Sequence, residues 1–528
     1  MAGRTVSTYQ GTGGVAVTPH HLATAAAVDV MRNGGNAVDA AVAANATLGM
    51  VLPTTCGIGG DLFAMVHRPG MDRPDVLNAS GRGGSGLDAA RLRAAGHDTM
   101  PLRDPAAITV PGCVDGWEAL LARHGTRTLA DLLAPVIALG DEGFGVSDEL
   151  ASDLTRIERM IAGQPSAAAL YPDGSPPPAG TTLRRPDLAA TLRAIASDGR
   201  SAFYSGRVAN AIAGVTDGIL TEADLAANTP DWVAPVGAGV FGLTAWTVPP
   251  NSQGYLTVAA LMLIEALDPP ADPEDPAFHH AVIEAYRAMA WERDDLVADP
   301  RHAPLPPEAL LDPDRVLSRA ARLHPDRIAR WPESGPAQGG TAFLCVVDRD
   351  DVAVSLIQSN FTGIGSGISA GDTGVFLHNR GGGFSLIPGH PNEAAPGKRP
   401  LHTLAPTLWT RGDRAAMTLG TRGGHQQPQY LSQMAALMLH VGMTPSAAQL
   451  SPRWHTDEAG DGSRSTLVVE SRMSEEVVSG LGGRGHLVDR GPDFPQGWGP
   501  VSAIVLTDGG GRVAAADPRV SSALADGT

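Results

Sequence analysis

The first two helices of the chain are indicated by their apolar spacing and by the residues that bound them. One helix is predicted over residues 21–32, because the Asn-Gly-Gly run at 33–35 is a common left-handed helix end. A second helix is predicted to begin after Asn36, whose side chain can cap it together with Asp39, and to end before residue 53. Small residues, mostly Ala and Val, occupy all sides of this second helix. We therefore expect it to lie in the interior of the protein.

Strand-like patterns dominate the part of the chain after residue 340. Residues 341–348 and 352–359 are rich in apolar and β-branched residues, and the polar Arg-Asp-Asp run between them favours a hairpin. Similar runs at 415–420 and 465–470 are predicted strands, and 502–516 is predicted to be a closing hairpin. Continuous apolar runs of this kind are typical of strands that are covered on both faces.

The middle of the chain, roughly residues 114–330, has the pattern of helices separated by loops rich in Pro and Gly. A polar, Pro- and Gly-rich stretch at 331–340 follows and is predicted to be a linker. Helices before strands, with both faces of the sheets buried, favour an α+β fold, and specifically a four-layer αββα sandwich.

Composition and charge narrow the class of protein. The chain has 528 residues, of which 43% are hydrophobic, and this is a globular composition. A formal net charge of −17 argues against a nucleic-acid partner. The apolar stretches are too short to span a membrane, and the first residues lack the apolar core of a secretory signal. We therefore expect a cytoplasmic enzyme that acts on a small molecule.

Neither a metal nor a cofactor is expected. The three cysteines are too few for a disulfide framework and form no CxxC signature. The adjacent histidines at 20–21 and 279–280 lie at or in predicted helices, lack metal-ligand spacing and are interpreted as structural. No glycine motif of a phosphate-binding loop is present.

The predicted hairpin places two hydroxyl groups opposite each other. If residue 348 faces 352, pairing outward from the turn brings Thr341 opposite Ser359. On this pattern alone both could be ordinary strand residues, because Thr is common in strands. The glycines before Thr341 favour a catalytic role for this residue, since the Thr341 hydroxyl could attack the Gly340 carbonyl to form an ester. Hydrolysis of that ester would free a Thr α-amine, which can act as the base for its own hydroxyl.

Two other features are candidates for the same site. The Gly-Thr-Arg-Gly-Gly run at 420–424 follows a predicted strand, and its N–H groups could form an oxyanion hole. The alternative is an ordinary glycine turn. Arg82 is surrounded by small residues, which leaves room for a substrate carboxylate against its fork of donors. The alternative is a solvated surface arginine.

With these motifs the sequence resembles the γ-glutamyltransferases of the N-terminal-nucleophile superfamily. The resemblance extends from about residue 12 to 520, and its motifs are Gly-Gly-Asn-Ala-Val-Asp-Ala-Ala-Val at 34–42, Gly-Ile-Gly-Gly at 57–60, Val-Pro-Gly at 110–112, Pro-Pro-Asn-Ser-Gln-Gly at 249–254, Gly-Ser-Gly at 365–367, Gly374, Gly-Lys-Arg-Pro-Leu-His-Thr-Leu-Ala-Pro at 397–406 and Asp-Pro-Arg at 517–519. It implies an αββα core and a heterodimer of a large chain, 1–340, and a small chain, 341–528, cut from one precursor. Whether two such heterodimers assemble further is left open.

The resemblance also implies roles for individual residues. Thr341 matches the nucleophile, and Ser359 matches the hydroxyl that supports it. Gly423 and Gly424 match the oxyanion-hole glycines, and Arg82 matches the arginine that holds the substrate carboxylate.

Several positions depart from the γ-glutamyltransferase pattern. Phe361 stands where that family has an asparagine that helps to bind the glutamyl group, and Arg380 replaces a glutamine or glutamate. Gly383 replaces the aspartate that receives the substrate ammonium, and His402-Thr403 replaces a serine pair. An ammonium without an anionic partner is poorly held in a dry pocket. Arg82, Phe361, Arg380, His402 and Thr403 are therefore expected to bind an acyl donor with carboxylate or keto oxygens and no free amine.

The departures are similar to the oxamate amidohydrolase branch of the family, in residues 358–359, 379–381, 401–403 and 423–429. We expect a self-cleaving amidohydrolase that acts on a small acidic acyl amide, with water as acceptor, through an acyl-enzyme on Thr341. A glutathione hydrolase or γ-glutamyltransferase is one alternative. A biosynthetic hydrolase that removes an acidic acyl group, by amide or C–C cleavage, is another, and a non-catalytic binding protein is the last.

Overall fold

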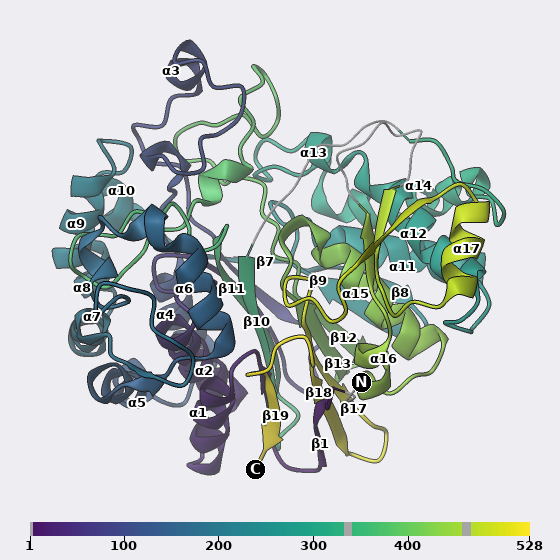
Figure 1. Cartoon of the computed structure of the whole chain (residues 1–528), viewed down its shortest axis with the longest axis horizontal. Helices are drawn as coiled ribbons and strands as arrows, with labels where there is room; N and C mark the ends of the chain where they lie inside the picture. The colour runs from purple at the N-terminus through teal and green to yellow at the C-terminus, as the bar shows by residue number, and fades with distance from the viewer. Residues whose placement is uncertain (1–3, 332–339, 457–465) are drawn as a thin grey trace.

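Two seven-stranded antiparallel sheets lie face to face at the centre of the molecule, and helices cover the outer face of each sheet (Figure 1). The computed structural model describes residues 4–331, 340–456 and 466–528. The predicted linker, apart from its two end residues, lies outside these ranges, and so does the first residue of the strand predicted at 465–470. The α+β fold with αββα layers predicted from the sequence is confirmed.

The strands of the two large sheets come from distant parts of the chain. Sheet A contains, in spatial order, β1 (Ser7–Gly11), β18 (Arg512–Ala516), β17 (Val501–Leu506), β13 (Arg414–Thr421), β12 (Thr407–Arg411), β9 (Leu243–Thr247) and β8 (Val236–Val240). Sheet B contains β19 (Leu524–Gly527), β2 (Val15–Thr18), β10 (Gly340–Val347), β11 (Ala353–Phe361), β3 (Asp61–His67), β4 (Asp75–Ala79) and β7 (Asp231–Val233). Two small sheets contain β14 (Trp454–Thr456), β15 (Thr466–Glu470) and β16 (Leu487–Gly491), and β5 (Phe144–Gly145) and β6 (Thr182–Leu183).

The helices form two groups. On the side of sheet B lie α1 (His21–Arg32), α2 (Ala37–Val51), α4 (Cys113–His124), α5 (Leu129–Glu142), α6 (Asp148–Ile161), α7 (Pro186–Asp198), α8 (Arg200–Tyr204), α9 (Arg207–Val215) and α10 (Glu222–Ala227) (Figure 1). On the side of sheet A lie α11 (Tyr255–Leu267), α12 (Pro276–Ala290), α14 (Pro313–Leu317), α15 (Gln427–Ala435), α16 (Pro445–Leu450) and α17 (Glu475–Gly483). Two shorter helices, α3 (Ala89–Ala94) and α13 (Arg293–Leu296), complete the set.

Three apolar clusters separate the four layers. Strand residues such as Phe63, Phe343 and Ile504 fill the space between the two sheets. A second cluster joins α2 and its neighbouring helices to the outer face of sheet B. A third joins α11, α12 and α15 to the outer face of sheet A. Removal of this apolar surface from water is the main contribution to the stability of such a fold.

The two helices at the start of the chain form as predicted. α1 ends at Arg32, and Gly34 has a φ of +83°, a left-handed conformation that glycine tolerates best. The side chain of Asn36 accepts hydrogen bonds from the N–H groups of Val38 and Asp39, and the Asp39 carboxylate accepts one from Asn36 N–H. Every residue of α2 is buried, which confirms its predicted place in the interior.

Several short strands are not apparent in the sequence pattern. β1, β2 and β4 precede most of the helices, and β7–β9 lie in the middle third, where only helices were expected. The prediction that helices come before strands is therefore wrong, although the layers are right. β7 has three residues and β8 contains two glycines, so neither shows a clear apolar alternation, and both are stabilised by pairing at sheet edges.

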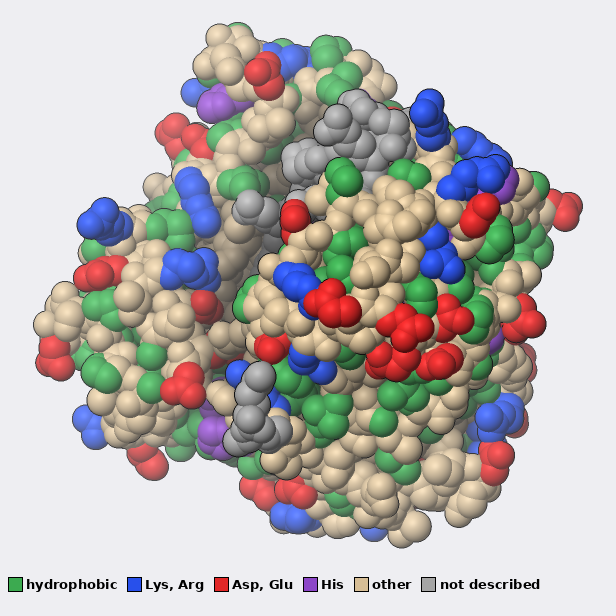
Figure 2. Space-filling view, turned by 45° about the vertical axis from the view of Figure 1, so that its right-hand side comes forward, with side chains coloured by type: hydrophobic (Ala, Val, Ile, Leu, Met, Phe, Trp, Pro, Cys, Tyr) green, Lys and Arg blue, Asp and Glu red, His purple; other side chains and the backbone are tan. Residues whose placement is uncertain are grey.

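Charges of both signs are dispersed over the surface. Figure 2 shows acidic and basic side chains interspersed on one face of the molecule, which has a net charge of −17. Within the described ranges, no helix combines the length and the apolar character that a membrane crossing needs.

The histidine pairs and the cysteines lie inside the fold. His20 accepts a hydrogen bond from Leu22 N–H at the start of α1, and a His280 ring nitrogen lies 2.7 Å from one of His486. These contacts fit the structural role predicted for both pairs. Cys56, Cys113 and Cys345 are buried free thiols.

Candidate active site

The hairpin of β10 and β11 brings the two predicted hydroxyl groups together. Thr341 Oγ1 donates a hydrogen bond to Ser359 Oγ at 3.3 Å, and both residues are buried. The register from Ala342 to Val347 is the predicted one. It changes between Ala342 and Gly340, which pairs with Phe361, so Thr341 lies at a β-bulge. A bulge redirects a side chain locally, and here the predicted contact is kept although the regular pairing is not.

The backbone after Ser359 reinforces this contact. Phe361 N–H donates a hydrogen bond to Ser359 Oγ at 2.7 Å. Phe361 adopts a φ of +72°, which is rare for a residue with a side chain and indicates a locally constrained backbone. Ser359 Oγ thus accepts hydrogen bonds from both Thr341 and Phe361, and this fixes its position beside the candidate nucleophile.

Asp61 lies on the other side of Ser359, as its cross-strand partner on β3. Its fully buried carboxylate accepts hydrogen bonds from Gly81 N–H at 3.0 Å and from His402 Nε2 at 3.1 Å. Burial alone would raise the pKa of Asp61, but His378, His402 and the Gly81 amide outweigh it and lower the pKa. Asp61 is therefore an ionised carboxylate at neutral pH.

His402 supports this carboxylate from behind the site. Its Nδ1 accepts a hydrogen bond from Leu404 N–H at 3.3 Å, which places the proton on Nε2, the atom that donates to Asp61. Burial, followed by the nearby Arg380, lowers the pKa of His402 to about 3, so the ring is neutral. Both ring nitrogens of the buried His402 are thus used within the protein, and its predicted contact with substrate stays a prediction.

Arg380 contacts Phe361, the residue whose N–H donates to Ser359. It begins a 3-10 turn, Arg380–Gly383, and its guanidinium carbon lies 3.9 Å from the centre of the Phe361 ring. Nη2 donates to Thr403 Oγ1 at 3.3 Å, whereas Nη1 is buried and has no partner within the described ranges. Burial lowers the pKa of Arg380 to about 9, so it remains charged at neutral pH. Nη1 therefore has a hydrogen-bonding capacity that no described group uses.

Position 383 cannot hold the aspartate found in γ-glutamyltransferases without movement of the backbone. A Cβ at Gly383 would lie 2.3 Å from the carbonyl oxygen of Leu401. The absence of an acid at this position is thus built into the close approach of two backbone segments. Residue 383 therefore contributes no anion near Arg380.

The glycine turn lies at the same end of the molecule as Thr341. A Cβ at Gly420 would lie 2.1 Å from the Phe343 ring, so the end of β13 packs directly on the start of β10. Gly423 and Gly424 follow with φ values of +126° and +58°. Gln253 Nε2 donates to the carbonyl oxygens of both Gly424 and Thr403, each at 3.1 Å. The turn is therefore tied to Thr403, which accepts a hydrogen bond from Arg380, through a carbonyl oxygen and not through its amide groups. The oxyanion-hole role of Gly423 and Gly424 stays a prediction.

Arg82 is not a lone arginine, because it forms two ion pairs within the protein. Its guanidinium donates to Asp231 at 2.9 Å and to Asp299 at 3.4 Å. Asp231 is on β7, which is separated from β10 by three strands, or about 19 Å at the usual strand spacing. The Arg82 side chain is thus directed to the edge of sheet B, although the adjacent Gly81 N–H reaches Asp61.

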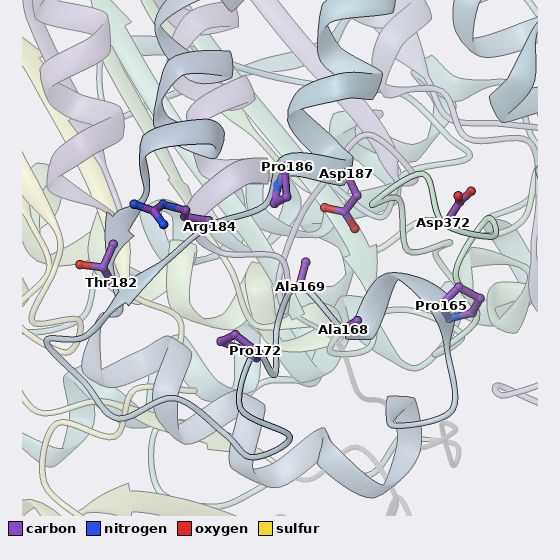
Figure 3. A pocket seen from close by; sticks show the side chains of 9 residues that line it. All are labelled: Pro165, Ala168, Ala169, Pro172, Thr182, Arg184, Pro186, Asp187 and Asp372. Carbon is purple, nitrogen blue, oxygen red and sulfur yellow. The ribbon is translucent and has the colours of Figure 1, made fainter.

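Two cavities of the described residues are lined by other side chains. One, of about 730 Å³, is lined by Arg82, Trp232, Trp246 and the aspartates that pair with Arg82. The other, of about 620 Å³, is lined mainly by proline and alanine, with Arg184, Asp187 and Asp372 around it (Figure 3). Neither is lined by Thr341, Ser359 or Arg380.

Asp61 and Gln253 are residues of the site that the sequence pattern did not single out. Asp61 follows the Gly-Gly of a tight turn at the start of β3, where a charged residue in a buried strand is itself unusual. Gln253 lies in the Pro-Pro-Asn-Ser-Gln-Gly motif at 249–254, and its amide joins segments that are 150 and 171 residues away. Only the folded structure brings these partners together.

Comparison with known proteins shows that the likeness covers nearly the whole chain. The family model for gamma-glutamyltranspeptidase matches residues 23–526. The glutathione hydrolase-like YwrD proenzyme of Bacillus subtilis is 36% identical over 96% of this chain and 97% of its own length. The oxamate amidohydrolase proenzyme of Klebsiella pneumoniae is 35% identical over 97% of this chain and 98% of its own.

A solved structure shows the same fold. The crystal structure of cephalosporin acylase from Bacillus halodurans superimposes with a TM-score of 0.91 at 31% identity. The match covers all of this chain and 98% of the acylase.

Proposed function

The chain belongs to the gamma-glutamyltranspeptidase family and is a hydrolase, and we propose that it is a self-cleaving amidohydrolase that acts on a small acidic acyl amide. The reaction would pass through an acyl-enzyme on Thr341. The arrangement of Thr341, Ser359, Arg380 and the glycine turn supports this proposal.

Maturation is the first step of the proposal. Thr341 Oγ attacks the Gly340 carbonyl, the peptide bond becomes an ester, and water hydrolyses that ester to free the Thr341 α-amine and a Gly340 carboxylate. The products are chains 1–340 and 341–528. They stay together as a heterodimer because β10 and β11 of the small chain lie between β2 and β3 of the large chain in one sheet. The names of the two relatives above describe both as proenzymes.

Turnover uses the same hydroxyl. The freed α-amine, with an ordinary pKa of about 7.7–8.0, accepts the hydroxyl proton as Thr341 Oγ attacks the amide carbonyl. It then protonates the leaving nitrogen, so that an amine departs and an acyl ester remains on Thr341 for hydrolysis. The amides of Gly423 and Gly424 would stabilise the oxyanion, and Ser359 would hold the attacking oxygen in place.

The buried guanidinium of Arg380 is the main support for the proposed class of substrate. A buried cation with an unpartnered Nη1 is costly unless an anion completes it, and a carboxylate on the acyl group would do so. Residue 383 supplies no carboxylate for a substrate ammonium, and its backbone leaves no room for one. We infer that the surroundings of Arg380 favour an acyl donor with a carboxylate and no free amine, as in oxamate.

The test is a substrate screen with the purified, matured protein. Its mass spectrum should show two chains divided at Gly340 and Thr341. Hydrolysis of oxamate or a glutaryl amide, with little hydrolysis of glutathione or γ-glutamyl-nitroanilide, would support the proposal. Efficient turnover of glutathione with oxamate inert would replace it by the glutathione hydrolase alternative.

A further inference from the structure

A buried ion pair connects the glycine turn to a helix far away in the sequence. Arg422 directly precedes Gly423, and its Nη1 donates to the carboxylate of Glu149 on α6. Both side chains are buried, with 9% and 4% of their surfaces exposed. The second oxygen of Glu149 has no partner in the described parts of the chain, so Arg422 is the partner found for this carboxylate.

Arg422 has a second contact that fixes its direction. Its Nη2 donates to the carbonyl oxygen of Gln496 at 3.0 Å. The guanidinium therefore joins three segments: the end of β13, the start of α6 and the loop 493–499. A planar guanidinium suits such a role, because its donors have fixed directions and it stays charged.

The loop that receives Arg422 also packs against the glycine turn. A Cβ at Gly499 would lie 2.1 Å from the Tyr430 ring, and a Cβ at Gly423 would lie 3.0 Å from the same ring. Tyr430 is thus enclosed by two glycines, with φ values of +55° at Gly499 and +126° at Gly423. Movement of the loop or of Tyr430 would move the backbone of Gly423.

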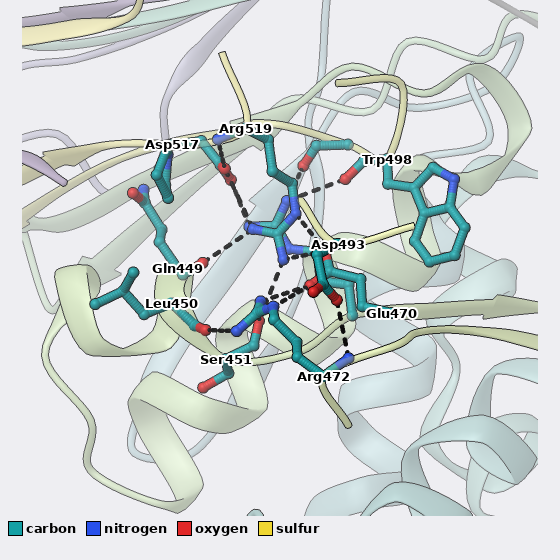
Figure 4. A network of polar contacts seen from close by, with 12 residues as sticks. Gln449, Leu450, Ser451, Glu470, Arg472, Asp493, Trp498, Asp517 and Arg519 are labelled. Atoms are coloured by element: carbon teal, nitrogen blue, oxygen red, sulfur yellow. Dashed lines mark hydrogen bonds and ion pairs between the residues drawn. The ribbon is translucent and has the colours of Figure 1, made fainter. Parts of the chain in front are cut away.

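The far side of this loop is held by a network of charges (Figure 4). Arg453 donates to the carbonyl oxygens of Trp498 and Gly499 and to Asp517. Arg472 N–H donates to Asp493 at 2.9 Å, and its guanidinium lies against the Phe494 ring. Figure 4 shows Asp493 and Trp498, which belong to the loop, together with Arg472, Asp517 and Arg519. The network anchors the loop to its own half of the molecule, whereas Arg422 connects it to α6.

We propose that Arg422 and Glu149 are positioning residues for the oxyanion turn. The inference rests on the proposed function, in which Gly423 and Gly424 stabilise the oxyanion. In that proposal, cleavage also places Glu149 in the large chain and Arg422 in the small chain. The pair then makes the geometry of the turn depend on how the two chains are docked. Neither residue touches the substrate.

Loss of the pair should affect the transition state more than substrate binding. Without Glu149, Arg422 is a buried charge with no ionic partner, and it would move toward water. The adjacent Gly423 amide would move with it. Donors aimed at an oxyanion act only once that charge develops, so kcat should fall while KM is unchanged.

The experiment compares Glu149→Gln, Arg422→Gln and the double variant, each as matured two-chain enzyme, with oxamate as substrate. We expect kcat to fall about 10-fold in each single variant, with KM within about 2-fold of wild type, because one displaced donor is worth at least this much. The double variant should lose no more than Arg422→Gln alone, because the two residues act as a unit. Asp148→Asn is the matched control: it removes the neighbouring carboxylate of α6, which contacts Ser521, and should keep the wild-type kcat.

Three results would overturn the inference. They are a wild-type kcat in Glu149→Gln, an equal loss in Asp148→Asn, and losses that multiply in the double variant. If Glu149→Gln does not fold, Arg422→Lys provides the test. This variant keeps the charge but cannot reach both Glu149 and Gln496. An unchanged kcat would overturn the proposal, and a lowered kcat would support it. Failure of the proposed function is separate, since it would appear in the wild-type protein as an uncut Gly340–Thr341 bond or as a lack of oxamate hydrolysis.

Discussion

Thr341 Oγ1 and Ser359 Oγ are joined by a hydrogen bond of 3.3 Å at the one place where the β10–β11 ladder changes register. A regular ladder would hold Thr341 as one more paired residue of a buried strand. The irregular position frees the residue from strict pairing while Ser359 still restrains its hydroxyl. That combination suits a group that must attack the carbonyl of the residue before it.

Replacement of Thr341 by alanine should leave the chain uncut. Without the hydroxyl there is no nucleophile for the Gly340 carbonyl, so a single chain of 528 residues is expected in the mass spectrum. Thr341→Ser is the control, because it keeps the hydroxyl and should still be cleaved. N-terminal sequencing of active wild-type enzyme should begin Thr-Ala-Phe; active protein with no free Thr341 would contradict the mechanism.

Removal of the Ser359 hydroxyl should slow both maturation and turnover. Ser359→Ala removes the acceptor that holds Thr341, and one aligned group at a reacting centre accounts for about 10- to 1000-fold in kcat. The matched control is Ser355→Ala, which removes a buried hydroxyl from the same strand, one with no partner in the described part of the chain. Equal rates for the two variants would show that Ser359 has no special role.

The sequence was sufficient to predict features that depend on neighbouring residues. The caps of α1 and α2 and the hairpin that carries Thr341 follow from local patterns, and the structure reproduces them. The αββα layers follow from the continuous apolar runs of strands such as β11. Interactions of this kind are decided over a few residues, where side-chain chemistry and spacing are visible in the sequence.

Features that depend on distant partners could not be predicted in this way. Arg82 looked unpaired because Asp231 and Asp299 lie 149 and 217 residues away. The contact of the His402 ring with Asp61, 341 residues earlier, could likewise not be seen in the sequence. The charge of a side chain is visible in the sequence, but its partner is not.

Introduction of an aspartate at position 383 should destabilise the protein rather than convert its specificity. A Cβ there meets the Leu401 carbonyl oxygen at 2.3 Å, so Gly383→Asp should cost about 1–3 kcal/mol as the backbone moves apart. Thermal unfolding measures this loss, and Gly163→Asp is a control at a glycine with open space around it. If Gly383→Asp combined with Arg380→Gln gave a stable enzyme that prefers γ-glutamyl donors, this reading of position 383 would be wrong.

Stability should fall as the pH drops below 6.5, in part because of His402. Burial lowers its pKa in the folded state from 6.5 to about 3, so between these values the unfolded chain takes up a proton that the folded protein does not. Each such group costs about 1.4 kcal/mol per pH unit in this window, and the cost is absent above 6.5. Urea unfolding at pH 7.5 and 5.5 should show a smaller change for His402→Gln than for wild type. An identical change would mean that His402 titrates normally in the folded protein.

Arg380, rather than Arg82, should determine the affinity for a carboxylate-bearing substrate. Arg380→Gln removes a cation that would contact the carboxylate in both ground and transition states, so KM should rise about 10- to 1000-fold with a smaller change in kcat. Arg82→Gln is the matched variant. Its guanidinium is already paired with Asp231 and Asp299, so its loss should change KM much less. Steady-state kinetics on oxamate with both matured variants separates the two arginines. A larger rise in KM for Arg82→Gln would show that Arg82 leaves its aspartates to bind substrate, and would restore the role that the family resemblance gave it.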